Sequence, residues 1–156
     1  MMINIAKKIT AIVMMLVGLS SVSTVSAHEG ATGVVKQRMG AMSDMADAMK
    51  VMALVVKGKQ EFDPVLFTQN GGIIVGHSDM IPSLFTQGLE QDMSEASPAI
   101  WQQWDDFVSI SIQTKSDAED LIQMAQKGGE LRPLTKQFVK LSGGCKACHK
   151  AYRKKK

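Results

Sequence analysis

The 156-residue chain carries 18 lysines and arginines against 15 acidic residues, a formal charge of +3, with 45% hydrophobic and 5% aromatic residues. This composition is typical of one soluble domain. It excludes a low-complexity chain, and no apolar stretch after residue 27 is long enough to span a bilayer.

The first 27 residues have the layout of a secretory signal peptide. Two lysines precede an apolar run, Ile9–Leu19, whose 11 residues fall well short of the roughly 18 to 20 that a membrane-spanning helix needs. Small residues at Val25 and Ala27 then offer a cleavage site. We therefore predict a signal peptide at 1–27, one domain at 28–156 and a periplasmic location. The alternative is an uncleaved membrane anchor.

Charge is distributed unevenly along the chain that remains after cleavage. It would hold 16 bases against 15 acids, a net charge of +1. Residues 136–156 contain eight bases and no acid, so residues 28–135 carry a net charge of −7. A basic tail can indicate nucleic-acid binding, but an exported protein with an acidic body argues against that partner.

Apolar residues recur at steps of three and four, the period of an amphipathic helix. The first such seam consists of Val35, Arg38, Met42, Met45, Met49, Met52 and Val56, followed by Gly58 as a helix stop. The last seam consists of Leu134, Phe138, Leu141, Cys145, Cys148 and Tyr152.

Two further helices are predicted between these seams from proline and capping signals. Asp63-Pro64 starts one that ends at about Met80, and a loop at 81–96 follows it. Ser97-Pro98 starts a single long helix that ends at Gly128-Gly129. No segment shows a convincing strand pattern. We therefore predict an all-α fold, an antiparallel four-helix bundle.

The last helix contains Cys145-Lys146-Ala147-Cys148-His149, the C-x-x-C-H attachment signature of a c-type haem. The two thiols add to the haem vinyl groups, and the histidine binds iron as an axial ligand. A thioredoxin-like redox pair belongs near a helix N-terminus, a structural zinc site needs four ligands, and a disulfide across one helical turn is strained. We therefore predict one covalent haem c, with Cys145 and Cys148 as its links and His149 as an iron ligand.

Two residues of the first seam are candidates for further haem contacts. Arg38 would be costly in a core without a partner, and a haem propionate supplies one. The alternative is an arginine that reaches solvent. Met42, one helical turn later, is either the sixth iron ligand or part of a methionine-rich core.

The sequence resembles the class II c-type cytochromes, the cytochrome c′ family. The match includes Arg38 with Met42, the Lys57-Gly58 helix end, the Asp63-Pro64 start, the loop at 81–85, Pro98-Ala99-Ile100-Trp101 and the haem motif through Arg153. The resemblance implies a periplasmic four-helix bundle with a single haem on its last helix, often a homodimer. It also implies Cys145 and Cys148 as haem links, His149 as fifth ligand and Arg38 as a propionate contact.

The family divides at the position of Met42. High-spin members leave iron five-coordinate there, whereas low-spin relatives use a methionine as sixth ligand. Met39 follows the arginine, where glutamine is frequent in the family, and we count it among the cofactor-binding residues.

These features favour a non-enzymatic electron carrier with His149 and Met42 on iron, which exchanges electrons with periplasmic redox proteins. The alternative is a five-coordinate protein that binds nitric oxide or carbon monoxide.

Overall fold

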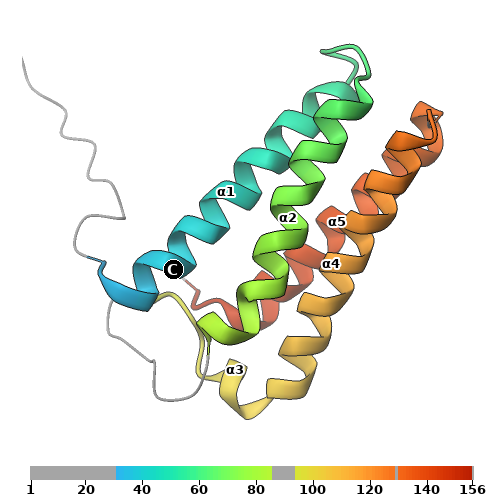
Figure 1. The fold of residues 1–156 in the computed structure, drawn as a ribbon. Helices are drawn as coiled ribbons and strands as arrows, with labels where there is room; N and C mark the ends of the chain where they lie inside the picture. Colours follow the sequence, from blue (N-terminus) through green and yellow to red (C-terminus); the bar gives the residue numbers. More distant parts are fainter. Residues whose placement is uncertain (1–30, 86–93, 129, 156) are drawn as a thin grey trace, which may run out of the picture.

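The computed structural model describes residues 31–85, 94–128 and 130–155, so the predicted signal peptide at 1–27 lies outside the described residues. The described chain forms four long helices and one short one: α1 (Gly33–Val56), α2 (Pro64–Leu84), α3 (Ala99–Gln102), α4 (Trp104–Gln126) and α5 (Leu131–Tyr152). The long helices lie alongside one another as a bundle (Figure 1). The predicted all-α four-helix bundle is confirmed. None of these helices combines the length and apolarity that a membrane crossing requires.

The turn between α1 and α2 follows the predicted capping chemistry. Gly58 adopts a left-handed backbone with φ of 66°, and its N–H donates to the Val55 carbonyl at 2.9 Å. This conformation favours glycine because a side chain there would be strained. At the start of α2, the Asp63 carboxylate accepts from the Val65 N–H at 2.8 Å. Local sequence therefore sets both helix ends.

Helix α2 is longer than predicted, because it continues through Pro82 to Leu84 instead of ending at about Met80. Proline has no N–H, so the Ser78 carbonyl lacks its usual donor four residues later. The Ser111 hydroxyl of α4 donates to that carbonyl at 2.6 Å. A tertiary hydrogen bond thus lets the helix pass its own proline.

The prediction of one long third helix is wrong, because Gln103 interrupts it with φ of −127° and ψ of 46°. No glycine or proline marks this break. Side chains on either side are instead held by tertiary bonds: Trp101 Nε1 donates to the Phe85 carbonyl at 2.7 Å, and Tyr152 donates to Asp106 at 2.5 Å. These tertiary hydrogen bonds, and no local sequence signal, therefore account for the break in the helix.

Helices α2 and α4 pack closely at Gly71. A Cβ atom built on Gly71 would lie 2.6 Å from Ile122 Cγ1, which is closer than real contacts allow. Gly71 and Gly72 are poor helix formers, but the helix tolerates them, and Gly71 permits close packing of α2 against α4.

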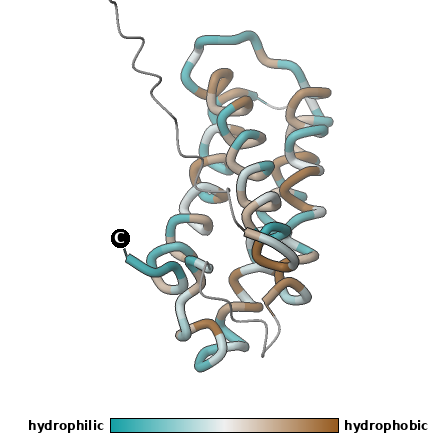
Figure 2. Tube along the Cα trace, turned by 90° about the vertical axis from the view of Figure 1, so that its left-hand side faces the viewer, coloured by the Kyte–Doolittle hydropathy of each residue, from teal (hydrophilic) through white to brown (hydrophobic). Residues whose placement is uncertain are grey.

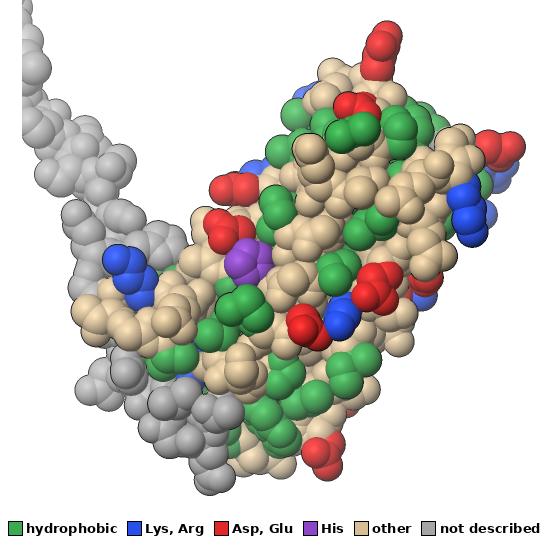
Figure 3. Space-filling view, viewed as in Figure 1, with side chains coloured by type: hydrophobic (Ala, Val, Ile, Leu, Met, Phe, Trp, Pro, Cys, Tyr) green, Lys and Arg blue, Asp and Glu red, His purple; other side chains and the backbone are tan. Residues whose placement is uncertain are grey.

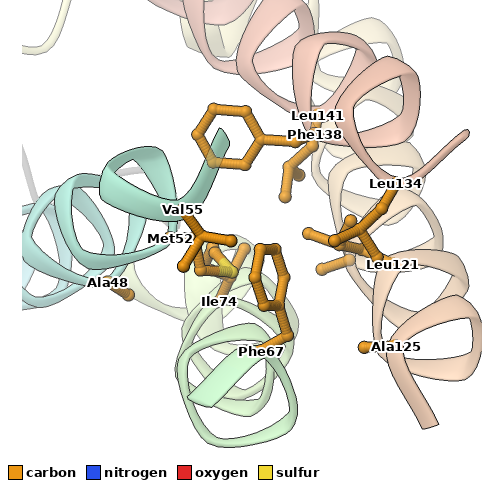
Figure 4. Packing of buried hydrophobic residues seen from close by; sticks show 11 residues of the cluster. Ala48, Met52, Val55, Phe67, Ile74, Leu121, Ala125, Leu134, Phe138 and Leu141 are labelled. Carbon is orange, nitrogen blue, oxygen red and sulfur yellow. The ribbon is translucent and has the colours of Figure 1, made fainter. Parts of the chain in front are cut away.

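The buried side chains form two groups at different heights of the bundle. We call the first the closed end: Ala48, Met52, Val55, Phe67, Ile74, Ala118, Leu121, Ala125, Leu134, Phe138 and Leu141. Figure 4 shows its side chains converging from α1, α2, α4 and α5. The second group, the cavity end, contains Ala41, Ile81, Leu84, Phe85, Ile100, Phe107 and Tyr152. Hydrophobic and hydrophilic stretches alternate along the helices that supply both groups of buried side chains (Figure 2).

Candidate functional site

Helix α5 carries the C-x-x-C-H motif at the cavity end. The helix is anchored by Leu134, Phe138, Leu141 and Tyr152, which are all buried. Between Leu141 and Tyr152, the side chains of Cys145 and Cys148 are only half-buried. His149 is exposed at the surface of the helix. The predicted continuation of the buried seam through the cysteines therefore holds only in part, because these side chains line a cavity.

That space consists of two adjoining cavities of about 350 and 280 Å³. Five residues line both: Met42, Ala46, Phe107, Cys148 and His149. The two cavities therefore adjoin at these residues, and their combined volume is in the size range of pockets that bind organic ligands. Residues of α1 and α5 line both cavities, and these two helices touch each other far less than α2 touches α4.

The first cavity has a polar wall around Arg38. This side chain is only 4% exposed, so it does not reach solvent as the alternative interpretation held. Its Nε donates to the Leu84 carbonyl at 2.6 Å, and its Nη1 to Ser94 Oγ at 3.3 Å. The guanidinium carbon also lies 4.4 Å from the centre of the Phe85 ring. The structure therefore places a positioned cation in the wall of the site.

The methionines of α1 divide between the site and the core. Met42 is half-buried and lines both cavities together with His149, so a thioether and an imidazole from two different helices border one space. Met39 lines the first cavity. Met45 and Met49 line the second and also pack against the closed end.

Burial changes the acid–base properties of the motif. It raises the pKa of Cys148 to about 11, with smaller contributions from Cys145 and Asp106, and it raises the pKa of Cys145 as well. Redox-active thiol pairs show the opposite trend, a lowered pKa. Partial burial of the imidazole lowers the pKa of His149, and the charge of Arg153 adds to this effect. A neutral imidazole retains the lone pair that a metal ligand needs.

The residues of the site suit a haem c. Two adjacent thiols and a neutral imidazole lie on one helix, the cavity walls are mostly apolar, and a buried arginine can pair with a carboxylate. Cys145, Cys148 and His149 would hold the group covalently and through its iron. Arg38 and Met42 lie in the same walls.

Several residues that line the first cavity could not be predicted from the sequence. Ser94 and Glu95 line it, although they lie in the predicted loop at 81–96 and follow no helical period. Phe85 belongs to the segment 81–85 that resembles the family, and Tyr152 ends the α5 seam, but the sequence gives neither a place in the site. The Tyr152 hydroxyl donates to Asp106 at 2.5 Å.

Comparisons with known proteins agree with this site. Residues 33–153 match the sequence model of the family described as Cytochrome C′. A cytochrome c-556 from Agrobacterium tumefaciens (strain II Chrys) is 31% identical over 124 residues, which cover 80% of this chain and 99% of the relative. Cytochrome c′ from Alcaligenes xylosoxydans xylosoxydans is 32% identical over 124 residues, which cover 78% and 94%.

Solved structures show the same bundle. Cytochrome c′ from Rhodopseudomonas palustris superposes with a TM-score of 0.71 at 26% identity and covers 81% of this chain and 99% of its own. Recombinant cytochrome c′ from Alcaligenes xylosoxidans gives a TM-score of 0.71 at 32% identity, with coverage of 78% and 94%. The chain therefore belongs to the cytochrome c′ family, the class II c-type cytochromes, and its cofactor is a covalently attached haem c.

Proposed function

We propose that this cytochrome carries single electrons in the periplasm. The observation that supports the proposal is the shared cavity wall of Met42 and His149, which come from α1 and α5. When bound, haem c supplies an iron that gains and loses one electron. An imidazole and a thioether together are the axial pair of electron-transfer cytochromes and raise the reduction potential.

Each site residue has a distinct task in this proposal. Cys145 and Cys148 fix the cofactor to α5 through thioether bonds. His149 and Met42 would bind iron from two different helices, α5 and α1, and so leave no coordination position for a substrate. Arg38 holds a propionate, because its guanidinium is already oriented by Leu84 and Ser94. The Met39 side chain packs against the cofactor from the same wall.

Redox partners are expected to dock on the basic part of α5. Lys146 and Lys150 are exposed beside the motif, and Lys154 and Lys155 follow the helix. Such a cluster attracts acidic protein surfaces and speeds their encounter at low ionic strength. The predicted export signal at 1–27 would bring the protein to partners outside the cytoplasm. In this role the protein is a carrier and not an enzyme.

The spin state of the ferric holoprotein tests the axial pair. We expect a low-spin EPR spectrum and a near-infrared methionine-to-iron band in the wild type. Both should be lost in Met42→Ala. The control is Met49→Ala, a methionine of the same helix that lines only the second cavity. A high-spin wild type, or a low-spin spectrum unchanged in Met42→Ala, would contradict the assignment.

Gas binding is the second candidate function. A nitric oxide complex has been solved for a variant of the Alcaligenes xylosoxidans cytochrome c′, which covers 79% of this chain at 32% identity with a TM-score of 0.71. For this function, Met42 would lie beside an iron coordination position that the gas occupies. Titration of the ferrous protein with carbon monoxide separates the candidates: rapid binding by the wild type favours gas binding, and binding only in Met42→Ala favours electron transfer.

We also propose a homodimer that forms through α2. The exposed face of this helix carries Val65, Gly72, Ile73, Gly76 and Met80, with Asp79 as its one acid. Figure 3 shows hydrophobic and uncharged side chains over α2. Ile73→Arg should convert the dimer to a monomer in sedimentation experiments, whereas Ile112→Arg, on exposed α4 surface, should not.

A further inference from the structure

The segment 94–97 is attached to both sides of the first cavity. Towards α1, Ser94 Oγ accepts from Arg38 Nη1 at 3.3 Å. Towards α5, the Ser97 N–H donates to the Tyr152 carbonyl at 2.9 Å, and the Lys154 N–H donates to the Glu95 carbonyl at 2.8 Å. Because its neighbours are bonded on both sides, Glu95 has a fixed backbone position in the cavity wall.

The Glu95 carboxylate forms an ion pair with Arg153. The Arg153 Nε donates to Glu95 Oε2 at 2.7 Å, and Nη2 contacts the same oxygen. Arg153 lies one helical turn after His149, and all three residues line the first cavity. Both side chains of the pair remain partly exposed, at 43% for Glu95 and 48% for Arg153. Their charges therefore act on the cavity but are screened by salt.

One cation and one anion, held together, therefore stand in the cavity wall that His149 also lines. The electrostatic potential at this wall depends on the balance between their charges.

We propose that Glu95 is a charge-setting residue of the haem site, whose carboxylate, fixed against Arg153 beside His149, lowers the reduction potential of the iron. The proposal rests on His149 as the iron ligand and is independent of Met42. Ferric iron carries one more positive charge than ferrous iron. A nearby anion therefore stabilises the ferric state, and Arg153 partly offsets this effect.

Potentiometric titration of the holoprotein, followed by visible absorption, tests the proposal with Glu95→Gln. Glutamine keeps the size of the side chain and an oxygen that can accept from Arg153, but it removes the negative charge. At a fixed applied potential and low salt, we expect the ratio of ferrous to ferric protein to rise roughly two- to tenfold. Coulomb's law gives this size of effect for a unit charge at about 5–10 Å in a high-dielectric surrounding. The increase should shrink as salt is added.

The matched control is Glu130→Gln. Glu130 precedes the other end of α5, so the same loss of charge should leave the ratio nearly unchanged. A third variant, Arg153→Gln, should lower the ratio, because it removes the cation. The proposal is overturned if Glu95→Gln matches Glu130→Gln, if it lowers the ratio, or if it only lowers the melting temperature.

Failure of this proposal can be told apart from failure of the electron-carrier function. The ferric spectrum of the wild type reports the Met42 ligand and does not depend on Glu95. The comparison of Glu95→Gln with Glu130→Gln remains meaningful whether iron is five- or six-coordinate.

Discussion

The closed end and the cavity end of the bundle are built from the same helices, but their side chains pack differently. At the closed end, Phe67, Leu121, Leu134 and Leu141 are completely buried, and none of them lines either cavity of the site. At the cavity end, a buried arginine and two half-buried cysteines line the cavities of the haem site. The chain therefore completes one half of its core with its own side chains, and the haem completes the other half.

The largest effect is expected from removing the cysteines at the cavity end. The double variant Cys145→Ala/Cys148→Ala should lose all covalently bound haem, because no other cysteine exists in the sequence. Mass spectrometry of the denatured protein measures the loss directly. The control Ala147→Ser changes the exposed residue between the thiols and should keep the haem. Covalent haem in the double variant would refute the assignment of the links.

A truncation at the closed end should change stability but leave the haem site intact. Leu121 is fully buried, so Leu121→Ala should lower the free energy of unfolding by about 2–5 kcal/mol. Urea unfolding of the holoprotein measures this loss, and the visible spectrum of the native state should not change. Ile112→Ala, at a position that is 62% exposed on the same helix, should stay within about 0.5 kcal/mol. A changed haem spectrum in Leu121→Ala would show that the two ends are not separable.

Adjacent glycines of α2 should respond oppositely to the same substitution. Gly71→Ala places a methyl group against Ile122 and should cost about 1–3 kcal/mol of stability. Nothing lies within 4 Å of a Cβ at Gly72, so Gly72→Ala should stabilise the helix by about 0.5–1 kcal/mol. Thermal unfolding of the two variants compares them directly. Equal effects would mean that α2 and α4 are not in close contact at Gly71.

The smallest effect concerns Tyr152 and appears only in alkali. Burial, followed by the hydrogen bond to Asp106, raises the pKa of Tyr152 to about 12. A phenol with a pKa of about 10 in the unfolded chain then stabilises the fold fully below pH 10. This contribution is lost as the pH rises through about 12.

Comparison with Tyr152→Phe isolates that contribution. The stability difference between wild type and variant should shrink between about pH 10 and 12, as measured by urea unfolding at each pH. Since Tyr152 is the only tyrosine in the sequence, tyrosinate absorption reports its ionisation without overlap from another tyrosine. A difference that stays constant across this range would show that the hydroxyl does not titrate with a raised pKa.

Most of the fold could be predicted because its determinants are local. The seam of α1, the Gly58 stop and the Asp63-Pro64 start depend on residues within a few positions of one another. The wrong predictions concern helix boundaries that depend on residues far apart in the sequence. Ser111 supports α2 past Pro82, and bonds from Trp101 and Tyr152 flank the break at Gln103.

The site divides in the same way. Cys145, Cys148 and His149 form a motif that can be read from five consecutive residues, and Arg38 is conspicuous in an apolar seam. Glu95 could not be found, because its position depends on backbone bonds between the C-terminal segment and residues 94–97. Nothing in the sequence around it indicates that pairing.

The raised thiol pKa values concern the chain before its haem is attached, because the attached protein has thioethers at both positions. Burial favours the protonated form of both thiols in a chain that folds without its cofactor. A protonated thiol is a weaker nucleophile than a thiolate. A chain that folds before haem attachment would therefore present less reactive cysteines than an unfolded one.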